Sequence, residues 1–261
     1  MARRTIHRDV RKAINEAREM VGAAEKADAN EAETRRRIER IFETVMGYDA
    51  FRHLSRERAV RGAGETEHVD FAIQLEEGDE AKPKIMVEIK RVSVDLAPKH
   101  LRQVSSYAIN AGSEWILLTN SKEWRLYHVS FGQPPITKLM FTWNLLEDDV
   151  ASLAQRFSLI SYKNVARGGL DKLWTKASVL LPRNVLEAIF SEDSVRVLRR
   201  ELKRTTGVFL SLEDVVSGVR RLLNESAAAE MENMRISFPE HKARGRRRKV
   251  KEEDSPSTGN E

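Results

Sequence analysis

The chain has 261 residues, of which 41% are hydrophobic and 33% charged, which is ordinary for a soluble globular protein with a sizeable core. It has no cysteine, which excludes disulfides, a thiolate nucleophile and a cysteine-based zinc site, and no stretch approaches the roughly 18 apolar residues of a membrane span. The formal net charge is +5, and residues 242–251 alone hold seven Lys and Arg.

A charged amphipathic helix is predicted first, over residues 8–25, because apolar side chains recur there at helical spacing. We assign residues 1–27 to this N-terminal helix. The basic residues at the start of the chain precede no apolar segment, so we expect no secretory signal, no membrane contact and a cytoplasmic protein.

A second helix is predicted from Asn30, a good N-cap, to Gly47. The helical periodicity places two acids, Glu31 and Glu33, on different sides of this helix. At 100° per residue, Glu31 lies within about 40° of the apolar Ile38, whereas Glu33 lies about 140° from it. We therefore expect Glu31 on the buried stripe of this helix and Glu33 on its solvent side.

A polar stretch rich in Arg and Gly leads into a predicted strand, turn and second strand, with the strands at "VDFAIQL" and "IMVEIKR". In the second strand, Glu88 and Lys90 are two residues apart and share one face, while Val87 and Ile89 share the other. An apolar strand therefore carries one charged pair.

The remaining elements predict a mixed α/β sheet with helices on its faces. A helix opens at Pro98 and stops at Gly112, and two strands follow in "EWILLTNSKEWRLYHVSF". The sheet and its helices make a domain at residues 28–148. A helical extension at 149–228 and a disordered basic tail at 229–261 complete the predicted organisation.

Three acids are the candidates for chemistry. Glu31, Asp70 and Glu88 would repel one another in one domain without a cation, and a divalent metal resolves that conflict. Mg²⁺ takes oxygen ligands and typically uses one or two carboxylates plus substrate phosphate. Lys90 beside the metal can orient or deprotonate a water and offset charge on the phosphate.

Two further polar residues lie four apart on the predicted helix after the strands. Gln103 and Tyr107 are therefore neighbours on one helix face, beside its apolar stripe. Both can hydrogen-bond a phosphate, a metal-bound water or Lys90.

The ordered set "NEAETR", "VDFAI", "VEIK", "QVSSY" and "WILLTNSKEWRLYHV" resembles the N-terminal nuclease domain of type I restriction enzyme R subunits, in the PD-(D/E)xK superfamily. The resemblance spans roughly residues 28 to 130. It implies a restriction-endonuclease-like fold, metal ligands Asp70 and Glu88, the catalytic Lys90 and the supporting acid Glu31. Gln103 and Tyr107 correspond to the accompanying helix motif. Val69 replaces the motif's proline, and no helicase motor is present, so ATP-driven translocation is not implied.

We therefore expect a Mg²⁺- or Mn²⁺-dependent endonuclease that hydrolyses DNA in a restriction or defence role. No other cofactor is expected. The alternative is a non-cleaving nucleic-acid or partner-binding module on the same scaffold. RNA cannot be separated from DNA by these residues, because phosphate and metal chemistry are common to both. Cleavage of both strands needs two sites, which suggests a homodimer, and subunits of a restriction system are the other partners considered.

Overall fold

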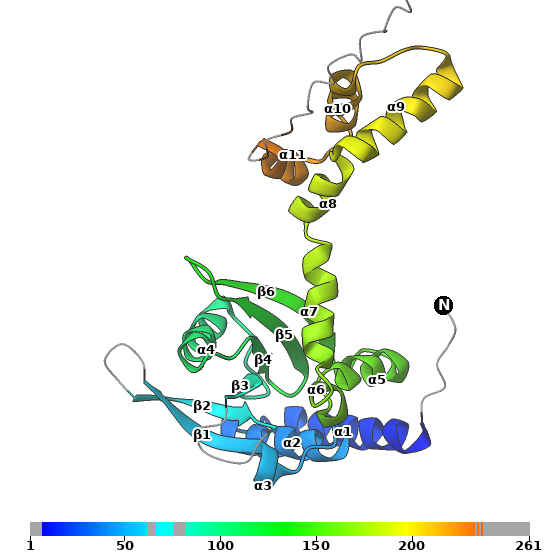
Figure 1. Cartoon of the computed structure of the whole chain (residues 1–261). Helices are drawn as coiled ribbons and strands as arrows, with labels where there is room; N and C mark the ends of the chain where they lie inside the picture. Colours follow the sequence, from blue (N-terminus) through cyan, green and yellow to red (C-terminus); the bar gives the residue numbers. More distant parts are fainter. Residues whose placement is uncertain (1–6, 62–65, 76–81, 233, 235, 237–261) are drawn as a thin grey trace, which may run out of the picture. The chain divides into compact units, whose positions relative to one another are not determined.

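The computed structural model describes residues 7–61, 66–75 and 82–232 with residues 234 and 236, and leaves the side chains of 57–61, 66–68, 226 and 230 undescribed. The chain forms two compact units, Met1–Ala177 and Ser178–Glu261 (Figure 1). The basic run at 242–251 lies outside the described residues.

The first unit is built on a mixed sheet whose spatial order follows the chain order. In the described residues its strands are β1 (Leu54–Arg61), β2 (Thr66–Ile73), β3 (Ile85–Ile89), β4 (Trp115–Thr119), β5 (Glu123–Ser130) and β6 (Ile136–Asn144). Neighbours are antiparallel except β3 and β4, which are parallel and are joined by helix α4 (Pro98–Ala111). The predicted α/β class, a mixed sheet flanked by helices, is confirmed.

Helices cover both faces of the sheet. Successive strand residues point to opposite sides, so one strand contributes apolar side chains to both faces. Val87 and Ile89 pack into a core with helices α1 (Arg8–Lys26), α2 (Glu31–Thr44) and α5 (Val150–Leu159). Met86 points the other way, into a second cluster beneath α4. Strand β3 is therefore buried on both faces of the sheet, at the apolar centre of the unit.

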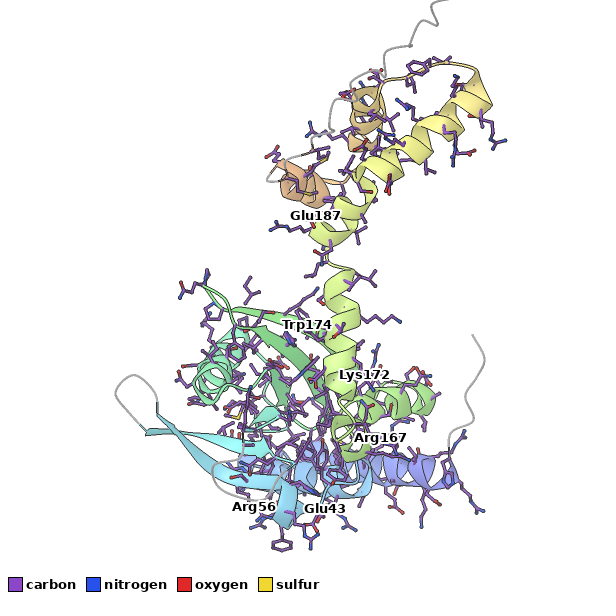
Figure 2. All side chains as sticks on the ribbon, viewed as in Figure 1. Glu43, Arg56, Arg167, Lys172, Trp174 and Glu187 are labelled. Carbon is purple, nitrogen blue, oxygen red and sulfur yellow. The ribbon has the colours of Figure 1, made fainter. Side chains whose placement is uncertain are left out.

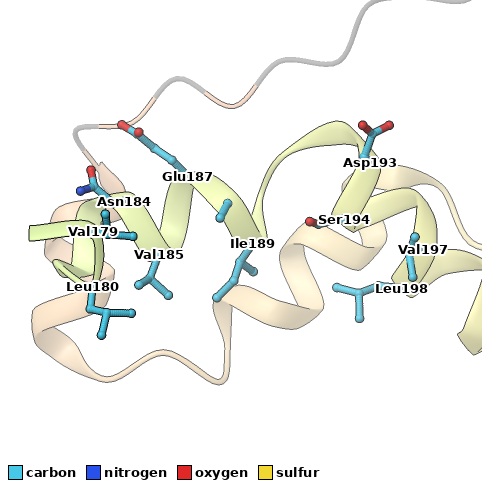
Figure 3. Close-up of a pocket in the computed structure, with 11 residues that line it drawn as sticks. Val179, Leu180, Asn184, Val185, Glu187, Ile189, Asp193, Ser194, Val197 and Leu198 are labelled. Carbon is cyan, nitrogen blue, oxygen red and sulfur yellow. The ribbon is translucent and has the colours of Figure 1, made fainter. Parts of the chain in front are cut away.

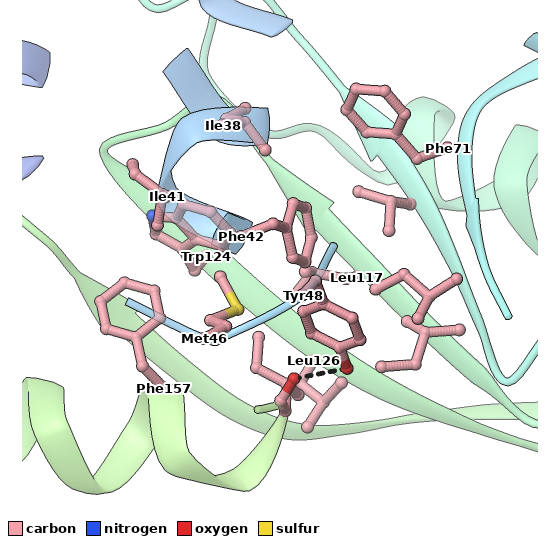
Figure 4. Close-up of a cluster of buried hydrophobic side chains, with 14 of the residues drawn as sticks. Ile38, Ile41, Phe42, Met46, Tyr48, Phe71, Leu117, Trp124, Leu126 and Phe157 are labelled. Atoms are coloured by element: carbon pink, nitrogen blue, oxygen red, sulfur yellow. Dashed lines mark hydrogen bonds between the residues drawn. The ribbon is translucent and has the colours of Figure 1, made fainter. Parts of the chain in front are cut away.

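Aromatic rings fill the first of these cores (Figure 4). Phe42 of α2 is fully buried and meets Tyr48, Phe71 and Trp124 edge to face, with ring centroids 5.7, 6.4 and 6.3 Å away. The Tyr48 hydroxyl donates a hydrogen bond of 2.8 Å to the carbonyl of Ile160, just beyond α5. Burial and the nearby Tyr162 raise the pKa of Tyr48, so its hydroxyl remains a donor.

Helix α6 (Tyr162–Val165) and helix α7 (Gly169–Val179) as far as Ala177 continue the first unit. The Trp174 ring of α7, labelled in Figure 2, stacks on His128 of β5 with centroids 3.6 Å apart. Burial lowers the pKa of His128 to about 4, so the ring is neutral and packs as an aromatic group. The chain thus divides after Ala177, within the region that the sequence assigns to the helical extension.

The second unit holds helices α8 (Pro182–Ile189), α9 (Glu192–Thr206), α10 (Leu212–Arg220) and α11 (Glu225–Glu232) in its described part. Helix α10 opens with a capping box: Ser211 Oγ accepts from the backbone N–H of Asp214, and Oδ2 of Asp214 accepts from the backbone N–H of Ser211. None of the described helices has the length and apolar character needed to cross a membrane.

The short helix α3 (Ala50–His53) and the strands β1 and β6 were not predicted, and residues 163–174, predicted as a connecting segment, form parts of α6 and α7. The two strands form the edges of the sheet, so each needs a partner on one side only. Edge strands tolerate charged and exposed residues, and β1 reads "LSRERAVR" while β6 is largely exposed. Local apolar patterning therefore carried too weak a signal for either strand.

Phe42→Ala should destabilise the first unit by about 3 to 5 kcal/mol, because the change leaves a cavity among three other rings. Urea unfolding followed by tryptophan fluorescence measures the loss, since Trp124 and Trp143 lie in the same core. Phe51→Ala is the matched control: Phe51 is 90% exposed, and its removal should change stability by no more than about 0.5 kcal/mol. Equal losses in the two variants would contradict this packing.

Candidate functional site

Glu88 and Lys90 form an ion pair at the end of β3, in which Glu88 is buried and Lys90 half-buried. Glu88 is 3% exposed, and Lys90 Nζ lies 2.7 Å from its Oε1. The two side chains share the sheet face that Met86 occupies, as strand alternation predicts. The ion pair therefore occupies the end of this sheet face, where the apolar side chains of β3 stop.

Asp70 of β2 completes the hydrogen bonding of this strand end. The backbone pairing of β2 with β3 runs from Ile73 opposite Ile85 to Phe71 opposite Val87. Beyond it, the backbone N–H of Ile89 donates 2.8 Å to Oδ2 of Asp70. A side chain thus takes the place of a backbone acceptor, which fixes Oδ2 and leaves Oδ1 for another partner.

That partner is Arg35 of α2, whose Nη2 donates to Oδ1 of Asp70 at 2.5 Å. Sequence reasoning missed this residue. The signal was available, because Arg35 lies four residues after Glu31 and three before the buried Ile38, and so on the same side of the helix.

Glu31 is the first residue of α2, next to the N-cap Asn30, whose side chain accepts from the N–H of Glu33. It lies on the predicted side of the helix and reaches the same cavity as Asp70. The expectation that it is buried is wrong: Glu31 is exposed, and the buried stripe of α2 begins at Thr34. The reason is its position, because a residue at the helix end can follow the phase of the stripe and still lie beyond the core.

Gln103 and Tyr107 are in contact but play different parts. The Gln103 side chain donates 3.0 Å to the Tyr107 hydroxyl. Gln103 lines the cavity, whereas Tyr107 is 1% exposed and packs in the cluster beneath α4. Tyr107 does not belong to the cavity lining; it holds Gln103 in place.

Residues of α2, β2, α4 and the end of β3 line a cavity of about 370 Å³. It is lined by Glu31, Arg35, Val69, Asp70, Glu88, Lys90 and Gln103. Of the six residues predicted for the site, the structure brings five to one cavity, and the sixth, Tyr107, supports it from behind.

The charges of this cavity are strongly coupled. Burial raises the pKa of Glu88 to about 7; the hydrogen bond and charge of Lys90 oppose this rise, and the charges of Asp70 and Glu31 add to it. Burial lowers the pKa of Lys90, but its hydrogen bond to Glu88 and the surrounding acids outweigh burial and raise it. Lys90 is therefore a fixed cation among three carboxyl groups.

The donor set suits a hard cation, although it is not a preassembled chelate. In the described part of the chain, no three acidic or histidine side chains are grouped to hold a metal ion. Instead, Asp70 Oδ1 is held by Arg35 and Glu88 Oε1 by Lys90. Mg²⁺ needs only one or two protein carboxylates and keeps several waters, so Asp70 and Glu88 would be enough to hold it if their ion pairs with Arg35 and Lys90 rearranged.

Residues 30–139 match the family model described as type I restriction enzyme R protein N terminus. The resemblance predicted from the sequence motifs is thereby confirmed for this segment, which covers α2 through the first four residues of β6 and includes every predicted site residue. The mixed sheet flanked by helices has the restriction-endonuclease-like fold that the resemblance implied. Neither the curated proteins nor the solved structures contain a match to the chain.

Glu88→Gln should change how stability depends on pH. Because folding raises the pKa of Glu88, protonation of this residue adds to the free energy of unfolding of wild type. The added stability is present in full below the unfolded pKa of 4.5 and is lost as pH rises to the folded pKa of about 7. That shift corresponds to about 3 kcal/mol, which Glu88→Gln should gain over wild type between about pH 4 and 8.

Urea unfolding in EDTA across this pH range measures the difference. Glu43→Gln, on the outer side of α2, controls for the loss of any carboxylate. A difference between Glu88→Gln and wild type that stays constant with pH would contradict the burial of a carboxyl group at this position.

Proposed function

We propose that the chain is a metal-dependent endonuclease of the PD-(D/E)xK type that hydrolyses DNA phosphodiesters, with its site in the cavity at the end of β3. The observation that carries the proposal is the convergence of Asp70, Glu88 and Lys90 on one cavity in a segment that matches a restriction-enzyme family. Glu31 and Gln103 reach the same cavity from helices on opposite faces of the sheet.

Asp70 and Glu88 would hold Mg²⁺ or Mn²⁺ in this site, and the bound ion would supply positive charge for a phosphate at the moment of bond breaking. Asp70 is suited to this part because Ile89 fixes its Oδ2 and leaves Oδ1 toward Arg35 and the cavity. Glu31, being exposed at the helix end, supports the site through its charge, which acts on both Glu88 and Lys90.

Lys90 would orient the attacking water and offset charge on the phosphate. An ammonium group has three donors, and Glu88 takes one of them. Orientation of the water is the role we favour over its deprotonation, because the ammonium group has donors beyond the one that Glu88 takes. Gln103, held by Tyr107, adds a neutral hydrogen-bonding group on the α4 side.

The proposal is tested by incubating the protein with plasmid, linear and single-stranded DNA and with RNA, in Mg²⁺, Mn²⁺ or EDTA. Asp70→Asn and Lys90→Met should each lower the cleavage rate at least about 100-fold, because each removes a preorganised charge at the reacting phosphate. The controls Glu43→Gln and Lys172→Met lie outside the cavity and should cleave as wild type does.

The substrates and variants separate the alternatives. Cleavage that survives in Asp70→Asn would place any activity elsewhere or in a contaminant. If wild type and both site variants bind DNA equally and none cleaves it, the non-cleaving binding module replaces the nuclease. Cleavage restricted to RNA would keep the metal site and change the substrate.

Arg35→Gln should increase affinity for the divalent cation about 10-fold or more, because Arg35 and the metal would compete for Oδ1 of Asp70. The rise in melting temperature on titration with Mg²⁺ or Mn²⁺ measures this without any substrate. Arg56→Gln, which removes a more exposed ion pair with Glu39, is the matched control and should leave metal affinity unchanged. Weaker metal binding in Arg35→Gln would show that Arg35 supports the carboxylate rather than competing for it.

A further inference from the structure

Helix α4 carries an exposed stripe that holds two cations and no acid. The buried residues of the helix lie on its other side, facing the sheet. From Lys99 onward, the exposed positions fall within about 100° around the helix axis. They are Lys99, Arg102, Gln103, Ser106 and Asn110.

This stripe borders the cavity at the end of β3. Gln103 lines the cavity, and Lys99 lies one turn before it on the same side of α4. Burial lowers the pKa of His100, and the charges of Lys90 and Lys99 lower it further, so both lysines lie near this ring. We call Lys99, Arg102 and Gln103 the α4 rim of the cavity.

The two cations of the α4 rim are not held by carboxylates. Neither Lys99 nor Arg102 forms an ion pair with another described residue. Four other cations around the cavity and at this end of the sheet do have partners: Arg35 with Asp70, Lys90 with Glu88, Arg91 with Asp28 and Lys122 with Glu25. Lys99 and Arg102 can therefore contact an anion without first losing a partner.

The sequence around α4 is also poor in acids. Residues 89–113 contain four Lys and Arg and a single acid, Asp95, which is exposed in the loop before the helix. An anion near α4 thus meets more positive than negative charge.

The opposite rim of the cavity has the reverse charge. Glu31 is exposed in the first turn of α2 and lines the cavity, and Glu33 is exposed in the same turn. Helices α2 and α4 pack on opposite faces of the sheet. A polyanion is repelled by the α2 side and attracted by the α4 rim, so the charges select one side of the cavity.

The larger groove along α8 and α9 of the second unit does not suit the same ligand (Figure 3). This groove has a volume of about 910 Å³, and most of its lining is aliphatic. Its charged lining residues are the acids Glu187 and Asp193, and no Lys or Arg is among the described residues that line it. Phosphate groups there would meet two acids and no cation.

We propose that the α4 rim binds the phosphate backbone of DNA through Lys99 and Arg102, so that the duplex lies on the α4 side of the cavity and not on the α2 side. The two cations are neighbours on the helix surface and can contact successive phosphates of one strand. Such contacts position the strand and carry no sequence information. The identity of the ligand rests on the proposed function, but the inference concerns binding and not bond breaking.

Lys99→Met and Arg102→Gln should each weaken DNA binding about 8-fold at about 0.1 M salt, because each phosphate contact contributes a slope of about 0.9 to the dependence of log affinity on log salt concentration. The slope itself should fall by about 1 in each variant. Fluorescence anisotropy of a labelled duplex with the full chain in EDTA measures both quantities. The seven Lys and Arg at 242–251 are the same in all variants, so differences between variants report on α4.

Arg36→Gln and Lys172→Met are the matched controls, since each also removes one cation. Arg36 is exposed on α2 and lies about 140° around that helix from Glu31, and Lys172 lies on α7 outside the cavity. Both should change affinity by less than about 2-fold, because salt screens charges that are distant from the phosphates. Arg102→Lys keeps the charge and should keep most of the affinity, and melting temperatures check that every variant is folded.

Equal affinity and equal salt slope in wild type, Lys99→Met and Arg102→Gln would overturn the α4 rim, even if wild type cleaves DNA. Losses as large in Arg36→Gln would show attraction by net charge alone and would also overturn it. If the rim variants lose affinity as expected while wild type never cleaves, the nuclease falls and the rim stands. Wild type that binds RNA alone, or no nucleic acid, would overturn the binding of DNA.

Discussion

The hydrogen bond from the backbone N–H of Ile89 to the carboxylate of Asp70 is the interaction on which the site depends. A strand buried on both faces must satisfy its backbone, and β3 does so through β2 and β4 along its length. At Ile89 a side chain takes over from the neighbouring strand. The Asp70 side chain thus pairs a buried N–H at the point where the backbone pairing of β2 and β3 ends. The same hydrogen bond holds its carboxylate in the wall of the cavity.

The second constraint is electrostatic. Three carboxyl groups meet in this cavity, and Glu88 is buried among them, so its pKa rises to about 7 even with Lys90 in contact. Arg35 and Lys90 offset the charges of the carboxylates they touch. The three carboxyl groups outnumber these two cations, which is the electrostatic basis of the proposed metal ion.

The two compact units differ in how completely they bury their apolar side chains. In the first unit, both sheet faces are covered, and Phe42, Trp124 and Phe157 lie in a closed core. In the second, Val197 and Leu198 of α9 stay exposed beside a small cluster. The first unit therefore buries its aliphatic and aromatic side chains more completely than the second.

The sequence by itself determined the elements whose signal is local. The helical phase of α2, the alternation of β3, the caps at Asn30 and Ser211 and the stop at Gly112 each follow from a few neighbouring residues. Only the tertiary structure decided the edge strands β1 and β6, the exposure of Glu31, the burial of Tyr107 and the ion pair of Arg35 with Asp70. These depend on which segments lie side by side, and residues 35 positions apart meet only when the sheet and its helices have packed.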